Sequence, residues 1–142
     1  MRLVYAWGFS TPGTTQVMKK CSLVFVYGTL RQGEVNHHLL GKAGLCGSHT
    51  TRPHYKMFSL GAYPAVVMRG PDRISGEVYR VDGRTMVALD RLEGYPRSYD
   101  RKLIATPWGR AWIYLYRESV HGRKRIPNGI WRDERHYRRW SR

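Results

Sequence analysis

The chain of 142 residues has only two cysteines, Cys21 and Cys46. They form no CxxC pair and have no ligand-like spacing to a histidine, so the sequence predicts neither a disulfide framework nor a zinc site. His37 and His38 are adjacent, and neighbouring side chains on a helix diverge by about 100°, which makes a shared metal ion difficult. We therefore expect no metal site, and a reduced, cytoplasmic protein.

Long apolar runs are also missing. No segment approaches the roughly 20 residues of a membrane-spanning helix, so a membrane is not an expected partner. Residues 1–17, which include Trp7, Gly8 and Pro12, lack the continuous apolar core of a signal peptide. We expect them to form an N-terminal extension, with the folded domain beginning at Met18.

Acidic residues are scarce, with 10 Asp and Glu against 25 Lys and Arg, which gives a net charge of +15. Eight of the basic residues and two of the acidic ones lie in residues 121–142. This balance favours attraction to anions, including phosphate polymers and carboxylate substrates. No recognised nucleic-acid motif accompanies the charge, so the sequence favours a solvated surface over a nucleic-acid partner.

The length fits one domain with its own core. We expect this domain over residues 18–120, followed by a basic C-terminal segment, residues 121–142, that packs partly on it.

Short strands and helices follow one another along the domain. Leu23–Tyr27 is continuously apolar, which predicts a central strand buried on both faces. Further strands are predicted at 45–51, 55–60, 65–68, 74–81, 100–105 and 110–116, and helices at 35–41 and 83–93. Asp82 is the expected N-cap of the second helix, and Gly94 its end. The pattern predicts an α+β domain in which six or seven short strands form a small mixed β-barrel with two or three short helices.

Glu93 is the candidate acid or base. Met86, Leu89, Asp90 and Glu93 share one face of the predicted helix, so Glu93 is expected to point inward. Removal from water raises the pKa of a carboxyl toward 7, as a general base or acid requires. The residues alone favour a structural role, in which Glu93 pairs with an arginine or accepts hydrogen bonds from a helix end. Asp90 is interpreted as a helix-surface or strand-capping residue.

The segment Tyr27-Gly28-Thr29-Leu30 follows the first strand. A glycine turn in this position can direct consecutive backbone N–H groups at an anion. It can also be a simple strand exit. Tyr95 and Tyr99 could line a pocket or pack in the core.

Residues Val24–His37 resemble the opening of gamma-glutamylamine cyclotransferases and their bacterial relatives, in the gamma-glutamyl cyclotransferase-like family. Further matching motifs follow in the same order and approximate spacing: Tyr63-Pro64, Gly76–Tyr79, Leu89–Glu93 and Tyr99–Arg101. The resemblance covers about residues 23–117. Ile126–Trp131 is similar to a C-terminal turn of the bacterial relatives, in which a tryptophan packs back on the barrel. Gly94-Tyr95-Pro96 departs from the animal enzymes.

The resemblance implies an enzyme of the acyltransferase or lyase type that releases 5-oxoproline and a free amine from a gamma-glutamyl amide by intramolecular aminolysis. It implies Glu93 as the catalytic base and acid, with no cofactor and a small gamma-glutamyl molecule as the partner. The implied substrate-binding residues are Tyr27, Gly28, Thr29, Leu30, Tyr63 and Tyr99. The alternative is a non-catalytic small-molecule-binding module of the same fold, or a weak nucleic-acid binder through the basic tail.

Overall fold

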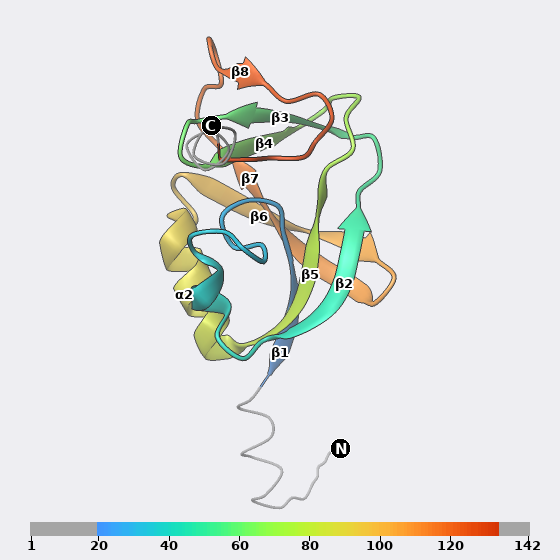
Figure 1. The fold of residues 1–142 in the computed structure, drawn as a ribbon, viewed down its shortest axis with the longest axis vertical. Helices are drawn as coiled ribbons and strands as arrows, with labels where there is room; N and C mark the ends of the chain where they lie inside the picture. The colour runs from blue at the N-terminus through green and yellow to red at the C-terminus, as the bar shows by residue number, and fades with distance from the viewer. Residues whose placement is uncertain (1–19, 134–142) are drawn as a thin grey trace, which may run out of the picture.

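The computed structural model describes residues 20–133 (Figure 1). The expected extension, residues 1–17, and residues 134–142 of the basic segment lie outside the described residues.

Five strands form the larger sheet, in the order β2-β5-β1-β7-β6. Their bounds are β1 Cys21–Val26, β2 Gly44–Thr50, β5 Ser75–Asp82, β6 Tyr99–Thr106 and β7 Gly109–Tyr116. The central strand, β1, runs antiparallel to β5 and parallel to β7. Val24 and Phe25 point to opposite faces of it and are both fully buried. The prediction of a central strand buried on both faces is therefore confirmed.

A second sheet of three strands lies at one end of the first (Figure 1). It contains β3 Tyr55–Ser59, β4 Pro64–Met68 and β8 Lys124–Arg125, in the order β4-β3-β8. β4 packs against β7 of the larger sheet. The guanidinium of Arg125 in β8 forms an ion pair of 2.9 Å with Asp72.

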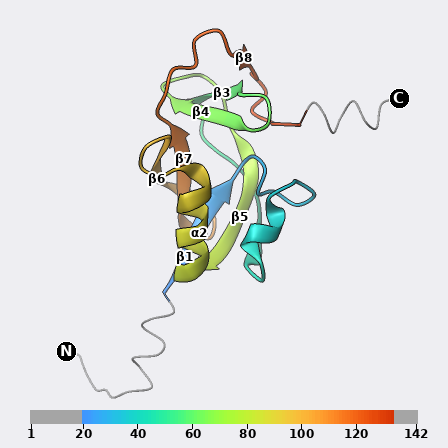
Figure 2. The ribbon, with the colours of Figure 1, turned by 90° about the vertical axis from the view of Figure 1, so that its left-hand side faces the viewer.

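The helix predicted at 83–93 is observed as α2, Gly83–Glu93. The Asp82 carboxylate accepts a hydrogen bond of 2.8 Å from the Thr85 amide, which caps the first turn. Gly94, at φ 66°, adopts the left-handed conformation that ends the helix. Figure 2 shows α2 in front of one face of the sheet.

The expected helix count is too high, because α2 is the one α-helix among residues 20–133. The segment expected to be helical at 35–41 forms η1, a single 3-10 turn over His37–Leu40. Only Leu39 and Leu40 are apolar there, which is too little buried surface to offset the cost of nucleating an α-helix. No helix in the described part of the chain is long and apolar enough to cross a membrane.

The expected α+β class with a mixed sheet is confirmed, but the strands do not close into the expected barrel. Over residues 20–133, eight strands divide over two sheets, and β2 and β6 are the edges of the larger one. The sheet does curl, because the Trp108 ring in the β6–β7 turn lies over Gly47 of β2, and the His49 imidazole interacts with the backbone of Ala105. Closure stops at these contacts, since the β3–β4 hairpin pairs with β8 instead of joining the larger sheet.

The strands of the larger sheet separate two apolar clusters. Phe25, Val78, Ile113 and the fully buried Trp131 belong to the first. Val24, Leu89 of α2, Tyr99 and Tyr114 belong to the second. Successive residues of β7 alternate between the two clusters. The helix side, with its tyrosines, is where the candidate site lies.

Candidate active site

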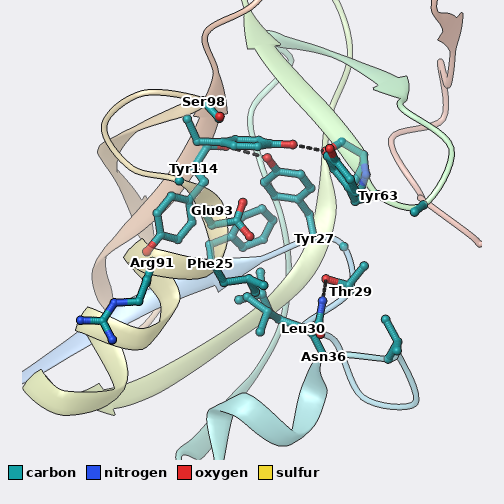
Figure 3. A pocket seen from close by; sticks show the side chains of 18 residues that line it. Phe25, Tyr27, Thr29, Leu30, Asn36, Tyr63, Arg91, Glu93, Ser98 and Tyr114 are labelled. Carbon is teal, nitrogen blue, oxygen red and sulfur yellow. Dashed lines mark hydrogen bonds between the residues drawn. The ribbon is translucent and has the colours of Figure 1, made fainter.

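A cavity of about 430 Å³ opens where β1 ends, between the last turn of α2 and the loop that joins β3 to β4 (Figure 3). The structure brings all seven residues predicted from the sequence into its wall: Tyr27, Gly28, Thr29, Leu30, Tyr63, Glu93 and Tyr99. Tyr95 is not among the lining residues, and its ring packs beside the Arg101 guanidinium instead. Of the two tyrosines left open by the sequence, Tyr99 therefore lines the pocket and Tyr95 does not.

Glu93 is the last residue of α2 and, among residues 20–133, the only carboxylate that lines the cavity. Leu89, one turn earlier, is fully buried and turns this helix face toward the sheet. Burial raises the pKa of the Glu93 carboxyl to about 7. Desolvation is the cause, because the ionised form loses water without gaining a compensating charge.

No hydrogen bond or ion pair to the Glu93 carboxylate is found within residues 20–133. Arg91 lines the same cavity, but its guanidinium points away from Glu93 in Figure 3. An ion pair between Glu93 and an arginine, which the sequence allowed, is therefore not observed among these residues.

Two tyrosine hydroxyls in the wall are held by backbone oxygens. The Tyr27 hydroxyl donates a hydrogen bond of 2.7 Å to the Tyr114 carbonyl, and the Tyr99 hydroxyl donates one of 2.8 Å to the Pro64 carbonyl. Burial raises the pKa of both phenols well above the ordinary range. They are therefore neutral at pH 7, and their rings form fixed walls around Glu93.

The loop after β1 is held by two residues that follow it. The Asn36 amide donates a hydrogen bond of 2.8 Å to the Thr29 carbonyl, and Asn36 Nδ2 donates one of 3.0 Å to Thr29 Oγ1 (Figure 3). Arg31 donates to the Gly28 carbonyl from its amide and from Nε, both at 3.1 Å. Sequence analysis did not single out Asn36, although it lies inside the matching motif.

The amides of Gly28, Thr29 and Leu30 donate no hydrogen bond to another group of residues 20–133. Three successive unpaired N–H groups beside a cavity are a suitable cradle for an anion. Gly28 does not have a positive φ, so the reason for a glycine is space. A Cβ there would lie 2.8 Å from the Pro64 ring.

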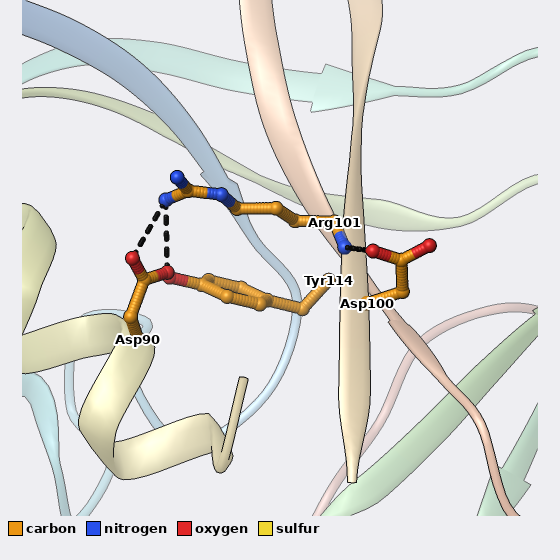
Figure 4. Close-up of polar contacts among 4 residues, drawn as sticks. All are labelled: Asp90, Asp100, Arg101 and Tyr114. Carbon is orange, nitrogen blue, oxygen red and sulfur yellow. Dashed lines mark hydrogen bonds and ion pairs between the residues drawn. The ribbon is translucent and has the colours of Figure 1, made fainter. Parts of the chain in front are cut away.

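An ion-pair network behind the cavity was not predicted (Figure 4). Asp90 accepts two hydrogen bonds from Arg101 Nη1, at 2.8 and 2.9 Å, and one of 2.7 Å from the Tyr114 hydroxyl. The Arg101 guanidinium lies 4.6 Å from the Tyr95 ring centre and 4.5 Å from that of Trp112. Asp90 therefore joins α2 to β6 and β7 one turn before Glu93, and is not a simple surface or capping residue. The sequence signal for these contacts was that Asp90 lies on the same face of the helix as Glu93.

Within residues 20–133, no three side chains of His, Cys, Asp or Glu gather where they could hold a metal ion.

Comparison with known proteins agrees with this geometry. The family model described as gamma-glutamyl cyclotransferase, AIG2-like matches residues 24–133. A Vibrio cholerae protein named "Putative gamma-glutamylcyclotransferase" is 49% identical over 109 residues, which is 77% of this chain and 94% of that protein. The Escherichia coli gamma-glutamylcyclotransferase family protein YtfP is 43% identical over 110 residues, covering 78% of this chain and 96% of YtfP. The chain belongs to the gamma-glutamyl cyclotransferase, AIG2-like family.

Solved structures show the same fold. The solution structure of Escherichia coli YtfP matches with a TM-score of 0.65 at 42% identity, over 80% of this chain and 98% of that one. The crystal structure of an uncharacterised Pyrococcus horikoshii protein matches with a TM-score of 0.71 at 27% identity, over 83% of this chain and 96% of that one.

Proposed function

We propose that the protein is a cyclotransferase that releases 5-oxoproline and a free amine from a gamma-glutamyl amide by intramolecular aminolysis. The observation that carries the proposal is Glu93, the one carboxylate in the wall of the cavity, with a pKa raised to about 7 and no partner among the described residues. The family of the chain and the names of its relatives support the same chemistry.

In this reaction Glu93 acts first as base. Its carboxylate takes a proton from the substrate's α-ammonium, so the nitrogen lone pair can attack the carbonyl carbon of the side-chain amide. The new C–N bond closes the five-membered ring. Glu93 then returns the proton to the leaving nitrogen as the old C–N bond breaks. The second proton lost by the ring nitrogen passes to the released amine, so no water is consumed.

The remaining groups of the cavity hold the substrate folded. The free amides of Gly28, Thr29 and Leu30 bind the α-carboxylate or the developing oxyanion, where fixed donors stabilise charge best. Tyr27 and Tyr99 form rigid walls, and Tyr63 lies at the mouth. Since both reacting groups belong to one molecule, much of the rate gain comes from orientation, and the chemistry needs no cofactor.

The direct test is to incubate the purified protein with a panel of gamma-glutamyl amides and to quantify 5-oxoproline by chromatography. We expect release that depends on Glu93. If the folded protein forms no 5-oxoproline from any amide but binds one of them, the proposal is rejected in favour of a binding module.

A further inference from the structure

Four exposed apolar side chains surround the mouth of the cavity. Val35 is 66% exposed, Tyr63 49% and Leu92 39%, and Ala62 is exposed beside them. They come from three separate segments: the loop before η1, the β3–β4 loop and the last turn of α2. Single exposed apolar residues are ordinary. Their convergence at the entrance of one pocket, from segments far apart in the chain, indicates a contact surface for a ligand.

The charges around the cavity also disfavour a cationic ligand. In the described part of the chain, Arg91 and Glu93 are the only charged residues that line the cavity, and the Arg91 guanidinium points away from the interior (Figure 3). Within residues 20–133, a cation in the cavity would therefore meet no lining carboxylate other than Glu93. The chain as a whole carries a net charge of +15, which repels cationic ligands further.

The two ends of a bound gamma-glutamyl amide would meet different surroundings. Its glutamyl end needs Glu93 and the free amides of residues 28–30, which lie at the end of β1. Its amine end must leave the pocket after the reaction, and so it faces the mouth. A cavity of about 430 Å³ is in the range of roughly 300–1,000 Å³ that accommodates more than the glutamyl group alone.

We propose that the amine portion of the substrate is apolar and uncharged, so that the protein acts on gamma-glutamyl amides of aliphatic or aromatic amines. This inference rests on the proposed function. Val35, Tyr63 and Leu92 contact the apolar group, and the contact removes both surfaces from water.

Three substrates that share the gamma-glutamyl group test the preference: the amides of isoamylamine, ethanolamine and putrescine. We expect the apolar isoamyl amide to have a kcat/KM about tenfold or more above the polar and cationic amides, the smallest effect typical of an apolar binding pocket. Equal values for the three, or a higher value for ethanolamine or putrescine, would overturn the proposal.

A matched pair of variants locates the preference. Leu92 and Val87 are both exposed apolar residues of α2, but only Leu92 lines the cavity. We expect Leu92→Gln to reduce the preference for the isoamyl amide several-fold, mainly through KM, because a contact made equally before and during the reaction changes binding alone. Val87→Gln should leave the preference unchanged. An equal effect of the two variants would show that the mouth does not contact the amine.

Binding separates this inference from the proposed function. Calorimetry with the Glu93→Gln variant measures affinity without turnover. If no amide yields 5-oxoproline, the proposed function fails. Tighter binding of the isoamyl amide would still support an apolar subsite at the mouth, and equal affinity for all three amides would overturn it.

Discussion

Glu93 shows how a single side chain acquires chemistry from its surroundings. Its carboxyl loses water at the end of α2 and finds neither an arginine nor an N–H donor among the described residues to replace it. A pKa of about 7 leaves both protonation states accessible at neutral pH. A residue that first accepts and then returns a proton needs this balance.

The first prediction removes the proton acceptor. Glu93→Gln keeps the shape of the side chain, so turnover should fall by roughly 10²–10⁴-fold while substrate still binds. Steady-state kinetics and calorimetry measure the two effects. Glu118→Gln makes the same change on an exposed residue outside the cavity and should leave turnover intact. Near-normal turnover by Glu93→Gln would exclude Glu93 as the base.

The raised pKa of Glu93 also predicts a pH dependence of stability. The folded protein holds the carboxyl proton up to about pH 7, whereas the ordinary pKa of an exposed glutamate carboxyl is 4.5. Its stabilising effect is therefore complete below about pH 4.5 and is lost as the pH rises through 7. As the pH rises from 5 to 8, the free energy of unfolding of Glu93→Gln should therefore increase relative to that of the wild type, by at most about 3 kcal/mol. Urea unfolding at both pH values measures the gain, and an unchanged difference would contradict the raised pKa.

Gly28 gives a prediction about space. A Cβ at Gly28 would lie 2.8 Å from the Pro64 ring, so Gly28→Ala should displace the loop from Pro64. Such overpacking costs the fold about 1–3 kcal/mol. Because the displaced amides would no longer face the anion in the same geometry, we expect the affinity for 5-oxoproline, measured by calorimetry, to fall about tenfold. Gly44→Ala is the control, because nothing lies within 4 Å of a Cβ there. Unchanged affinity in a folded Gly28→Ala protein would place the anion site elsewhere.

At the scale of elements, the sequence predicted what local patterns determine. The bounds of α2 follow from the cap at Asp82 and the glycine at 94, and β7 follows from its alternating side chains. β8 was missed because Lys124 and Arg125 are exposed and carry no apolar signal. Closure of the barrel depends on which hairpin pairs with which edge, and a long-range choice of this kind leaves no mark in a local pattern.

The candidate site shows the same difference between features set by local patterns and features set by long-range contacts. Seven of the residues that line the cavity were predicted because they lie in matching motifs or on one helix face. The bridge from Asp90 to Arg101 and Tyr114 was not, since it joins side chains 11 and 24 residues apart in the chain. The bridge joins the last turn of α2 to β6 and β7, and under the proposed function it would hold Glu93 in place.

The bridge can be tested against an equivalent ion pair elsewhere. Arg101→Gln leaves the half-buried Asp90 without its cation, which should cost about 1–3 kcal/mol in urea unfolding and lower kcat, because Glu93 is held less firmly. Arg125→Gln breaks the ion pair with Asp72, which is of similar length but outside the cavity. That variant should keep its kcat. Equal kcat values for the two variants would show that the bridge is structural only.

At the scale of the whole molecule, the C-terminal segment completes the core and reaches the candidate site. Trp131 is fully buried beside Phe25 and Ile113, and the Ile126 amide donates a hydrogen bond of 2.8 Å to the Met57 carbonyl. Arg31 donates to the Trp131 carbonyl as well as to the Gly28 carbonyl. The segment that contains Trp131 is thus connected through one arginine to the loop of residues 28–30, the proposed anion cradle.

Two truncations separate the part of the C-terminal segment that builds the core from the charge that follows it. Ending the chain after Asp133 keeps every described residue and removes four arginines and one glutamate, so the fold and the turnover of gamma-glutamyl amides should persist. Retention on a polyanion column should weaken, and more so at low salt, because such binding is electrostatic.

Ending the chain after Arg125 also removes Trp131. Loss of a buried tryptophan costs about 3–5 kcal/mol, a large part of the roughly 5–15 kcal/mol that stabilises a domain. We therefore expect this shorter chain to unfold at a markedly lower urea concentration and to lose activity with its fold. If the chain ending after Asp133 instead kept its urea midpoint but lost turnover, residues 134–142 would have to act at the cavity itself, and the division between core and charge would be wrong.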